Sequence, residues 1–146
     1  MPQSALFTGI IPPVSTIFTA DGQLDKSGTA ALIDALIKAG VDGLFFLGSG
    51  GEFSQLSGEE RKTIARFAID HVDRRVPVLI GTGGTNARET IELSQHAQGA
   101  GADGIVVINP YYWKVSEANL IRYFEQVADS VTLPVKIGRA SCRERV

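Results

Sequence analysis

The chain has 146 residues, of which 44% are hydrophobic and 21% charged, so it can bury the core of one domain and does not have the composition of a disordered protein. Its net charge of −2 argues against nucleic acid or an anionic membrane as the main partner, and no apolar stretch approaches the ~20 residues that cross a bilayer. The amino terminus has no basic region followed by a long apolar run, so no signal peptide is predicted and the protein is expected in the cytoplasm.

Short apolar runs alternate with amphipathic segments along the chain. The runs predict strands buried on both faces, at residues 9–11, 43–47, 76–80, 105–108 and 133–135. The amphipathic segments predict helices, at residues 25–40, 57–72, 86–101 and 116–130. The side chains predicted to face the core from three of these helices are Leu32, Ile33, Leu36, Ile37, Ile64, Phe67, Ala68, Val72, Leu120, Ile121, Phe124 and Val127.

Polar residues and glycines mark the ends of the predicted helices. Ser57 with Glu60, and Asn86 with Glu89, have the spacing of a capping box. A glycine ends two of the segments, at residues 40 and 101. The only cysteine and both histidines, Cys142, His71 and His96, are interpreted as having no part in a disulfide or metal site.

The order of elements is strand then helix, four times, followed by the start of a fifth strand. AGVDGL at 39–44 is echoed by AGADGI at 100–105, and the strands recur about every 30 residues, as βαβ units require. Two α/β architectures fit this order, an open doubly wound sheet and a (β/α)8 TIM barrel. Because such a barrel needs ~250 residues, the chain would form about half of one.

In both architectures the chemistry gathers in the loops after the carboxyl ends of the strands. GSGGEF at 48–53 and GTGGTN at 81–86 are rich in glycine, but neither matches G-x-G-x-x-G and neither is followed by GK[ST]. A nucleotide site is therefore disfavoured, whereas the amides and the hydroxyl of the first loop could bind a small carboxylate. The glycines of the second loop are better explained by a tight turn.

Aromatic residues follow the fourth predicted strand. Tyr111, Tyr112 and Trp113 could fill the rim of a barrel or an oligomer contact. Alternatively, one of the phenols could pass protons when it is hydrogen-bonded to another hydroxyl. Their spacing does not decide between the two interpretations.

The stretch GLFFLGSGGEFSQLSGEE at 43–60 resembles, along its whole length, the signature of the class I, Schiff-base-forming family of dihydrodipicolinate synthase and N-acetylneuraminate lyase. GIIPPVSTIF at 9–18, the segment 81–108 and NPYYWK at 109–114 look like neighbouring family segments, so the resemblance covers about residues 7–135. The GSGGEF form, with Phe53 after the glutamate, is most similar to the 2-keto-3-deoxy-gluconate aldolase branch.

The resemblance implies a TIM barrel that forms an imine between a lysine and pyruvate or another 2-keto acid. The neighbouring C–C bond of a 2-keto-3-deoxy sugar acid can then break, giving pyruvate and an aldehyde, with no metal or organic cofactor. Ser49 would touch the substrate carboxylate and join a proton relay, and Tyr112 would complete the relay of a neighbouring subunit across a tight dimer of a homotetramer. Gly50 stands where many members have threonine or serine, leaving the Gly50 and Gly51 amides to hold the carboxylate and disfavouring dihydrodipicolinate synthase activity.

The family's Schiff-base lysine lies on the sixth strand and its second relay tyrosine on the fifth, and neither is found in this chain. Lys136 would lie on the wrong strand, and the chain is expected to be an inactive amino-terminal fragment. Residues 136–146 carry four basic residues and one acidic one, which leaves 10 basic and 15 acidic residues in the rest. Their codons can spell a sequencing adapter, so residues 1–135 are predicted to be native and residues 136–146 a non-native tail.

Two other functions stay open at this point. The first is 4-hydroxy-tetrahydrodipicolinate synthase, within the same family. The second belongs to another class, a non-catalytic half-barrel that acts as a scaffold or interaction protein. Open strand edges on such a half-barrel would favour pairing or aggregation.

Overall fold

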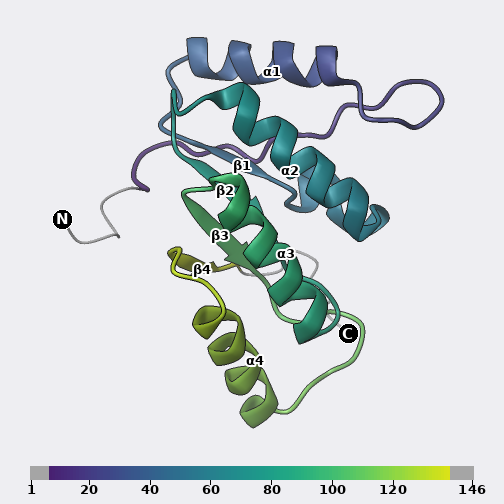
Figure 1. Ribbon diagram of the computed structural model, residues 1–146, viewed down its shortest axis with the longest axis vertical. Helices are drawn as coiled ribbons and strands as arrows, with labels where there is room; N and C mark the ends of the chain where they lie inside the picture. Colours follow the sequence, from purple (N-terminus) through teal and green to yellow (C-terminus); the bar gives the residue numbers. More distant parts are fainter. Residues whose placement is uncertain (1–6, 139–146) are drawn as a thin grey trace, which may run out of the picture.

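Polar side chains set the helix starts in the computed structural model, which describes residues 7–138 (Figure 1). The helices are α1 (Lys26–Lys38), α2 (Gly58–Val72), α3 (Ala87–Ala100) and α4 (Glu117–Asp129). Each is preceded by a residue whose side chain accepts the backbone N–H three positions on, namely Asp25, Ser57, Asn86 and Ser116. Ser57 and Glu60 form the complete predicted capping box, and Gly101, at φ 97°, ends α3 in the left-handed conformation.

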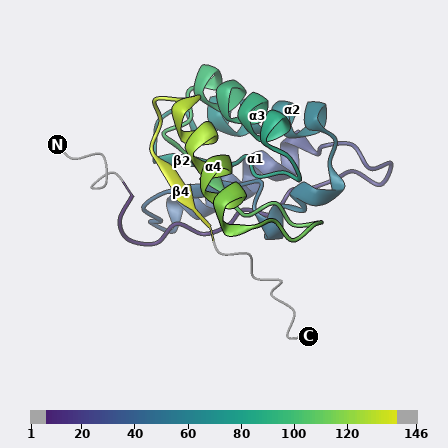
Figure 2. The same cartoon turned by 90° about the horizontal axis from the view of Figure 1, so that it is seen from below.

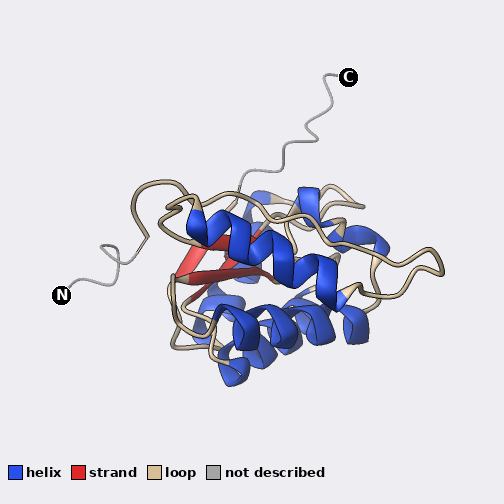
Figure 3. Ribbon diagram, turned by 90° about the horizontal axis from the view of Figure 1, so that it is seen from above, coloured by secondary structure: helices blue, strands red, loops and turns tan. Residues whose placement is uncertain are grey.

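Four short parallel strands form one sheet, in the order in which they occur along the chain. They are β1 (Leu44–Phe46), β2 (Val78–Gly81), β3 (Gly104–Val107) and β4 (Val135–Ile137). Because parallel crossovers are right-handed, this order places successive helices on the same side of the sheet. Figure 1 shows the helices following one another beside the strands, and Figure 3 distinguishes the helices from the short central strands by colour. A doubly wound sheet would carry helices on both faces, so the arrangement is that of consecutive units of a (β/α)8 barrel.

The core lies between the sheet and the helices. Strand β2 is buried at all four positions, as the predicted two-sided burial requires, and Ile33, Leu44 and Ile105 are fully buried around it. Within residues 7–138, no helix is long and apolar enough to span a membrane. Figure 2 shows β4 at the edge of the sheet beside α4, where the burial decreases and Ile137 is 65% exposed.

The predicted first strand, at residues 9–11, is not a regular strand. The segment instead makes an isolated parallel bridge between Pro13 and Phe45, supported by hydrogen bonds from Phe45 N–H to Pro12 O and from Val14 N–H to Phe45 O. Prolines 12 and 13 have no N–H to donate, so the ladder cannot continue through them. The segment nevertheless occupies the place of a strand beside β1.

The other predicted strands form, with shifted bounds. Strand β2 begins at Val78 and β4 at Val135, in each case after a proline whose carbonyl accepts a hydrogen bond although the proline itself donates none. Strand β4 continues through Lys136 and Ile137, so it crosses the predicted boundary at residue 135. Residues 139–146 of the predicted tail, including Cys142, lie outside the described range.

The predicted core face of α4 is wrong at one position. Ile121 is 53% exposed, whereas Tyr123 is buried and Val127 is fully buried. The hydroxyl of Tyr123 meets the buried hydroxyl of Thr90 at 3.0 Å, so the phenol packs against α3 without leaving its polar end unpaired. The helix is therefore rotated relative to the stripe that the aliphatic residues alone predict.

Candidate active site

The loops that follow β1, β2 and β3 lie together at the carboxyl ends of the strands, because the strands are parallel and adjacent. The first carries Ser49, the second is the GTGG turn that begins at Gly81, and the third carries Tyr112. Strand β2 stands between β1 and β3, so the GTGG turn separates the two loops that hold the predicted site residues.

The loop after β1 is held in a defined conformation by its backbone. Leu47 and Glu52 flank it with φ values of 59° and 57°, in the left-handed region that side chains other than glycine rarely adopt. Between them lies the 3-10 turn η2 (Ser49–Gly51), followed by the 3-10 turn η3 (Phe53–Gln55). The Thr16 hydroxyl donates to Gly51 O at 2.8 Å and so fixes η2 to the end of the first segment.

Ser49 and Gly50 are exposed at the surface of this loop, whereas Gly51 is buried. The Gly51 N–H donates to Gly48 O at 3.0 Å inside the turn. Among residues 7–138, no acceptor binds the N–H of Ser49 or of Gly50, so these two amides are the ones available to a ligand. A Cβ added at Gly50 would meet no atom within 4 Å, so the loop has room there for a side chain.

The aromatic loop after β3 is largely exposed. Tyr112 and Trp113 are each 78% exposed and contact one another edge to face, with ring centroids 5.5 Å apart. Tyr111 turns toward the first loop, where its ring meets Phe53 edge to face at 5.8 Å. The structure thus joins the two loops through Tyr111 and Phe53, and no hydrogen bond between Ser49 and Tyr112 occurs within residues 7–138.

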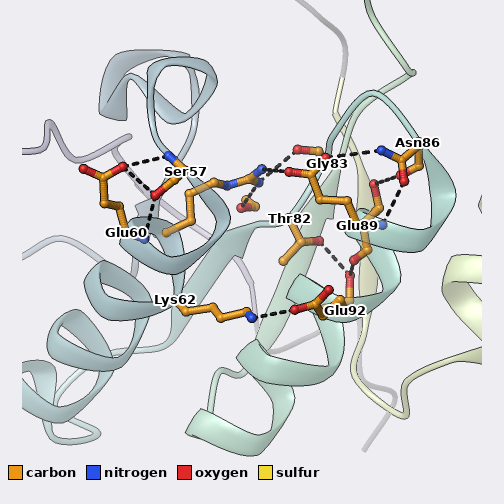
Figure 4. A network of polar contacts seen from close by, with 12 residues as sticks. Ser57, Glu60, Lys62, Thr82, Gly83, Asn86, Glu89 and Glu92 are labelled. Atoms are coloured by element: carbon orange, nitrogen blue, oxygen red, sulfur yellow. Dashed lines mark hydrogen bonds and ion pairs between the residues drawn. The ribbon is translucent and has the colours of Figure 1, made fainter.

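Arg61, near the start of α2, lies buried beneath these loops with 3% of its surface exposed. Its Nη2 donates to Gly83 O at 2.9 Å and to Gly81 O at 3.2 Å, and its Nη1 lies 3.9 Å from Glu89 Oε1. Figure 4 shows Gly83 and Glu89 in this network of polar contacts. Burial lowers the pKa of the guanidinium, and the Glu89 carboxylate partly opposes that shift.

A second set of buried polar groups extends from the GTGG turn into the interior. The Ser94 hydroxyl donates to Thr82 Oγ1 at 2.8 Å, and the Thr90 hydroxyl contacts that of Tyr123. Burial raises the pKa of Tyr123, which keeps the phenol protonated, and the hydrogen bond with Thr90 opposes the shift. All four side chains are buried, so these hydroxyls pair with one another in the interior.

Sequence reasoning missed Arg61 and Tyr123, although each left a signal. Arg61 falls on the same helical stripe as Ile64, Ala65 and Ala68, where a solvated cation is not expected. A charged residue on an apolar stripe therefore indicates a buried polar contact. Tyr123 gave a weaker signal, because it follows two aliphatic residues that fit the stripe equally well.

The remaining candidate residues lie where surface residues are expected. His71 contacts Asp34 at 3.0 Å across α1 and α2, and His96 lies on α3 with its pKa lowered by burial and by Arg66 and Lys62. Hydrogen bonds to Glu59 and Glu92 raise the pKa of Lys62 to about 12. In the described part of the chain, no group of three His, Cys, Asp or Glu side chains could hold a metal ion.

Lys136 is exposed on β4, with its amine 5.1 Å from the centre of the Phe7 ring. It stands opposite Val106 in the register of β3 and β4. The predicted roles of Ser49, Gly50, Gly51 and Tyr112 stay predictions at this stage.

Comparison with known proteins gives a consistent assignment. The sequence profile of the Dihydrodipicolinate synthetase family matches residues 6–138. The Escherichia coli (strain K12) protein YagE, provisionally named a 2-dehydro-3-deoxy-D-gluconate aldolase, is 94% identical over 137 residues, which are 94% of this chain and 45% of YagE. The crystal structure of YagE in complex with pyruvate superposes with a TM-score of 0.89 over 90% of this chain and 44% of that one.

More distant relatives include other activities. YjhH of Escherichia coli (strain K12), provisionally named a 2-dehydro-3-deoxy-D-pentonate aldolase, is 58% identical over 88% of this chain and 43% of its own length. A 4-hydroxy-tetrahydrodipicolinate synthase of Rhizobium meliloti (strain 1021) is 42% identical over 90% of this chain and 45% of its own length. The chain thus spans about 45% of the length of the curated relatives that it matches.

Proposed function

Because the chain belongs to the dihydrodipicolinate synthetase family, we propose that it supplies the first βα units of a Schiff-base aldolase that cleaves a 2-keto-3-deoxy sugar acid into pyruvate and an aldehyde. The observation that carries the proposal is the 94% identity to YagE, a relative whose name assigns it to this reaction and whose crystal structure contains pyruvate. Because this chain spans less than half of that relative, the remaining barrel units and the Schiff-base lysine belong to the rest of the enzyme.

In this proposal the loop after β1 holds the carboxylate of the 2-keto acid. The exposed Ser49 hydroxyl and the unbonded amides of Ser49 and Gly50 can donate to carboxylate oxygens. The amide of Gly51 has an acceptor inside η2, so it contributes mainly by fixing the turn. The imine nitrogen, positively charged, then withdraws electrons as the C–C bond breaks, and no metal or organic cofactor takes part.

Tyr112 serves as the proton-passing residue in a tight dimer. The exposure of Tyr112 and Trp113 supports this role, since large aromatic side chains left uncovered commonly mark an interface. No hydrogen bond joins Ser49 and Tyr112 within the described residues 7–138, which fits a phenol that completes the relay of a neighbouring subunit. A tetrameric assembly and a cytoplasmic location are further parts of the proposal.

The test is a chimera in which residues 1–135 are joined to the part of YagE that follows the matching segment, so that the predicted tail is left out. We expect it to release pyruvate from 2-dehydro-3-deoxy-D-gluconate and to retain a lysine-bound adduct when borohydride is added with pyruvate. Replacing Ser49 with alanine should lower the rate, and the 146-residue chain alone should be inactive. Absence of both cleavage and adduct in the folded chimera would contradict the proposal.

A second candidate is the synthase activity, which the 42% identical relative from Rhizobium meliloti favours. The glycine at position 50, in place of the hydroxyl residue of many family members, argues against it. The same chimera separates the two candidates. If the chimera forms 4-hydroxy-tetrahydrodipicolinate faster than it cleaves the sugar acid, the synthase becomes the favoured function.

A further inference from the structure

Arg61 carries physical costs that the proposed reaction does not explain. A buried cation loses its hydration, and a positive charge near a helix amino terminus is opposed by the helix dipole. Within the described residues 7–138, the Nε of Arg61 is buried with no hydrogen-bond partner. An aliphatic residue on the same stripe would avoid these costs, whereas Arg61 makes contacts that an aliphatic residue could not.

Those contacts reach the loops after β1 and β2 directly, and the loop after β3 through residues that they touch. The guanidinium donates hydrogen bonds to the carbonyls of Gly81, the last residue of β2, and of Gly83 in the loop that follows. Its carbon Cζ lies 5.2 Å from the centre of the Phe53 ring, in the loop after β1. A planar guanidinium can donate these two hydrogen bonds in its own plane and stack on the ring with its face, which the ammonium of lysine cannot do.

Two separate routes lead from Arg61 to the loop after β3. In the first, Phe53 passes the contact on to Tyr111, whose ring it meets edge to face. In the second, Gly83 packs tightly against Ile108, since an added Cβ at Gly83 would lie 2.8 Å from Ile108 Cγ1 and 3.0 Å from its backbone nitrogen. Ile108 leads directly into the aromatic loop, so both routes act on the segment that carries Tyr112.

The route to Ser49 is equally short. Gly81 approaches the backbone of Leu47, where an added Cβ would lie 2.2 Å from Leu47 O, and Leu47 immediately precedes the loop that carries Ser49. Phe53 follows η2 after one residue, Glu52, which is fixed in the left-handed conformation. Both ends of the Ser49 loop are thus in contact with groups that Arg61 touches.

We propose that Arg61 is a positioning residue, which ties together the loops after β1, β2 and β3 and thereby fixes the Ser49 loop relative to the Tyr112 loop. This inference rests on the proposed function for its catalytic consequence. Its structural content, the fixed separation of the loops, can be measured without any activity.

The first measurement is the distance between spin labels on the two loops of the 146-residue chain. Labels at Ser54→Cys and Lys114→Cys, in a Cys142→Ser background, report the loop separation, and both labelled positions are exposed. We expect Arg61→Lys and Phe53→Leu each to broaden the distance distribution. The matched controls on α2, Arg66→Lys and Phe67→Leu, should leave it unchanged.

The second measurement is steady-state kinetics of the same four variants in the chimera. Because a displacement of about 1 Å can cost about 10²-fold, we expect Arg61→Lys to lower kcat by one to two orders of magnitude with KM unchanged. A residue with only a structural role would lower the amount of folded enzyme but not kcat per folded subunit. Phe53→Leu should reproduce the loss, and the controls should match the parent.

The outcomes separate cleanly. If the distance distributions of Arg61→Lys and Phe53→Leu equal that of the parent, Arg61 does not fix the loops, whatever the kinetics show. Broadened distributions with parental kcat overturn the positioning role, because the loop separation would then not matter for the reaction. A parent chimera with neither cleavage nor adduct overturns the proposed function alone, and the distance measurement still decides whether Arg61 fixes the loops.

Discussion

Replacing Gly81 with alanine tests whether the close approach of two backbones positions the candidate site. An added Cβ at Gly81 would lie 2.2 Å from Leu47 O and 2.8 Å from Leu47 C, both backbone atoms that cannot rotate away. Ordinary van der Waals contact lies at 3.4–4 Å, so the end of β2 or the left-handed Leu47 must move. Overpacking costs about 1–3 kcal/mol, and we expect the upper end, about 3 kcal/mol of unfolding free energy.

The assay is urea unfolding of the 146-residue chain, followed by far-UV circular dichroism. With an m value of about 2 kcal/mol/M, the midpoint should fall by about 1.5 M. Gly50→Ala is the matched control, because its Cβ would meet no atom within 4 Å, and its stability should be unchanged or higher by up to about 1 kcal/mol. Equal midpoints for Gly81→Ala and the parent would refute the reasoning, since β2 could then retreat without cost.

Three further predictions use the same unfolding assay. Gly99→Ala should stabilise the chain by about 0.5–1 kcal/mol, because Gly99 lies in α3 with free space around its Cα, and destabilisation would contradict this. Ile33→Ala should cost about 3 kcal/mol while Ile121→Ala costs little, and equal losses would contradict the observed burial. Hydrogen bonds from Ser57 lower the pKa of Glu60 from its ordinary 4.5, so the stability that they contribute is present above pH 4.5 and is lost as the pH falls through the lowered pKa. Ser57→Ala should therefore reduce the loss of unfolding free energy at acid pH. An unchanged dependence of stability on pH below 4.5 would argue against this.

The sequence determined the helices because their signals are local. A capping residue and the N–H that it binds are three positions apart, as at Ser57 and Asn86, and a left-handed glycine ends a helix by its own conformation. The alternation of strand and helix likewise follows from short apolar runs. These local patterns were sufficient to predict the parallel sheet and the three loops that meet at the carboxyl ends of its strands.

The first strand, the rotation of α4 and the role of Arg61 depended on tertiary structure. Prolines 12 and 13 fit an apolar run, yet they interrupt a ladder whose partner lies about 30 residues away. Tyr123 is buried because a hydroxyl on α3 is there to meet it. Arg61 binds carbonyls 20 and 22 residues further along the chain, and such contacts exist only once the strands have been brought side by side. Local patterns fix elements through neighbouring groups, whereas a buried charge is stabilised by partners that only the folded sheet supplies.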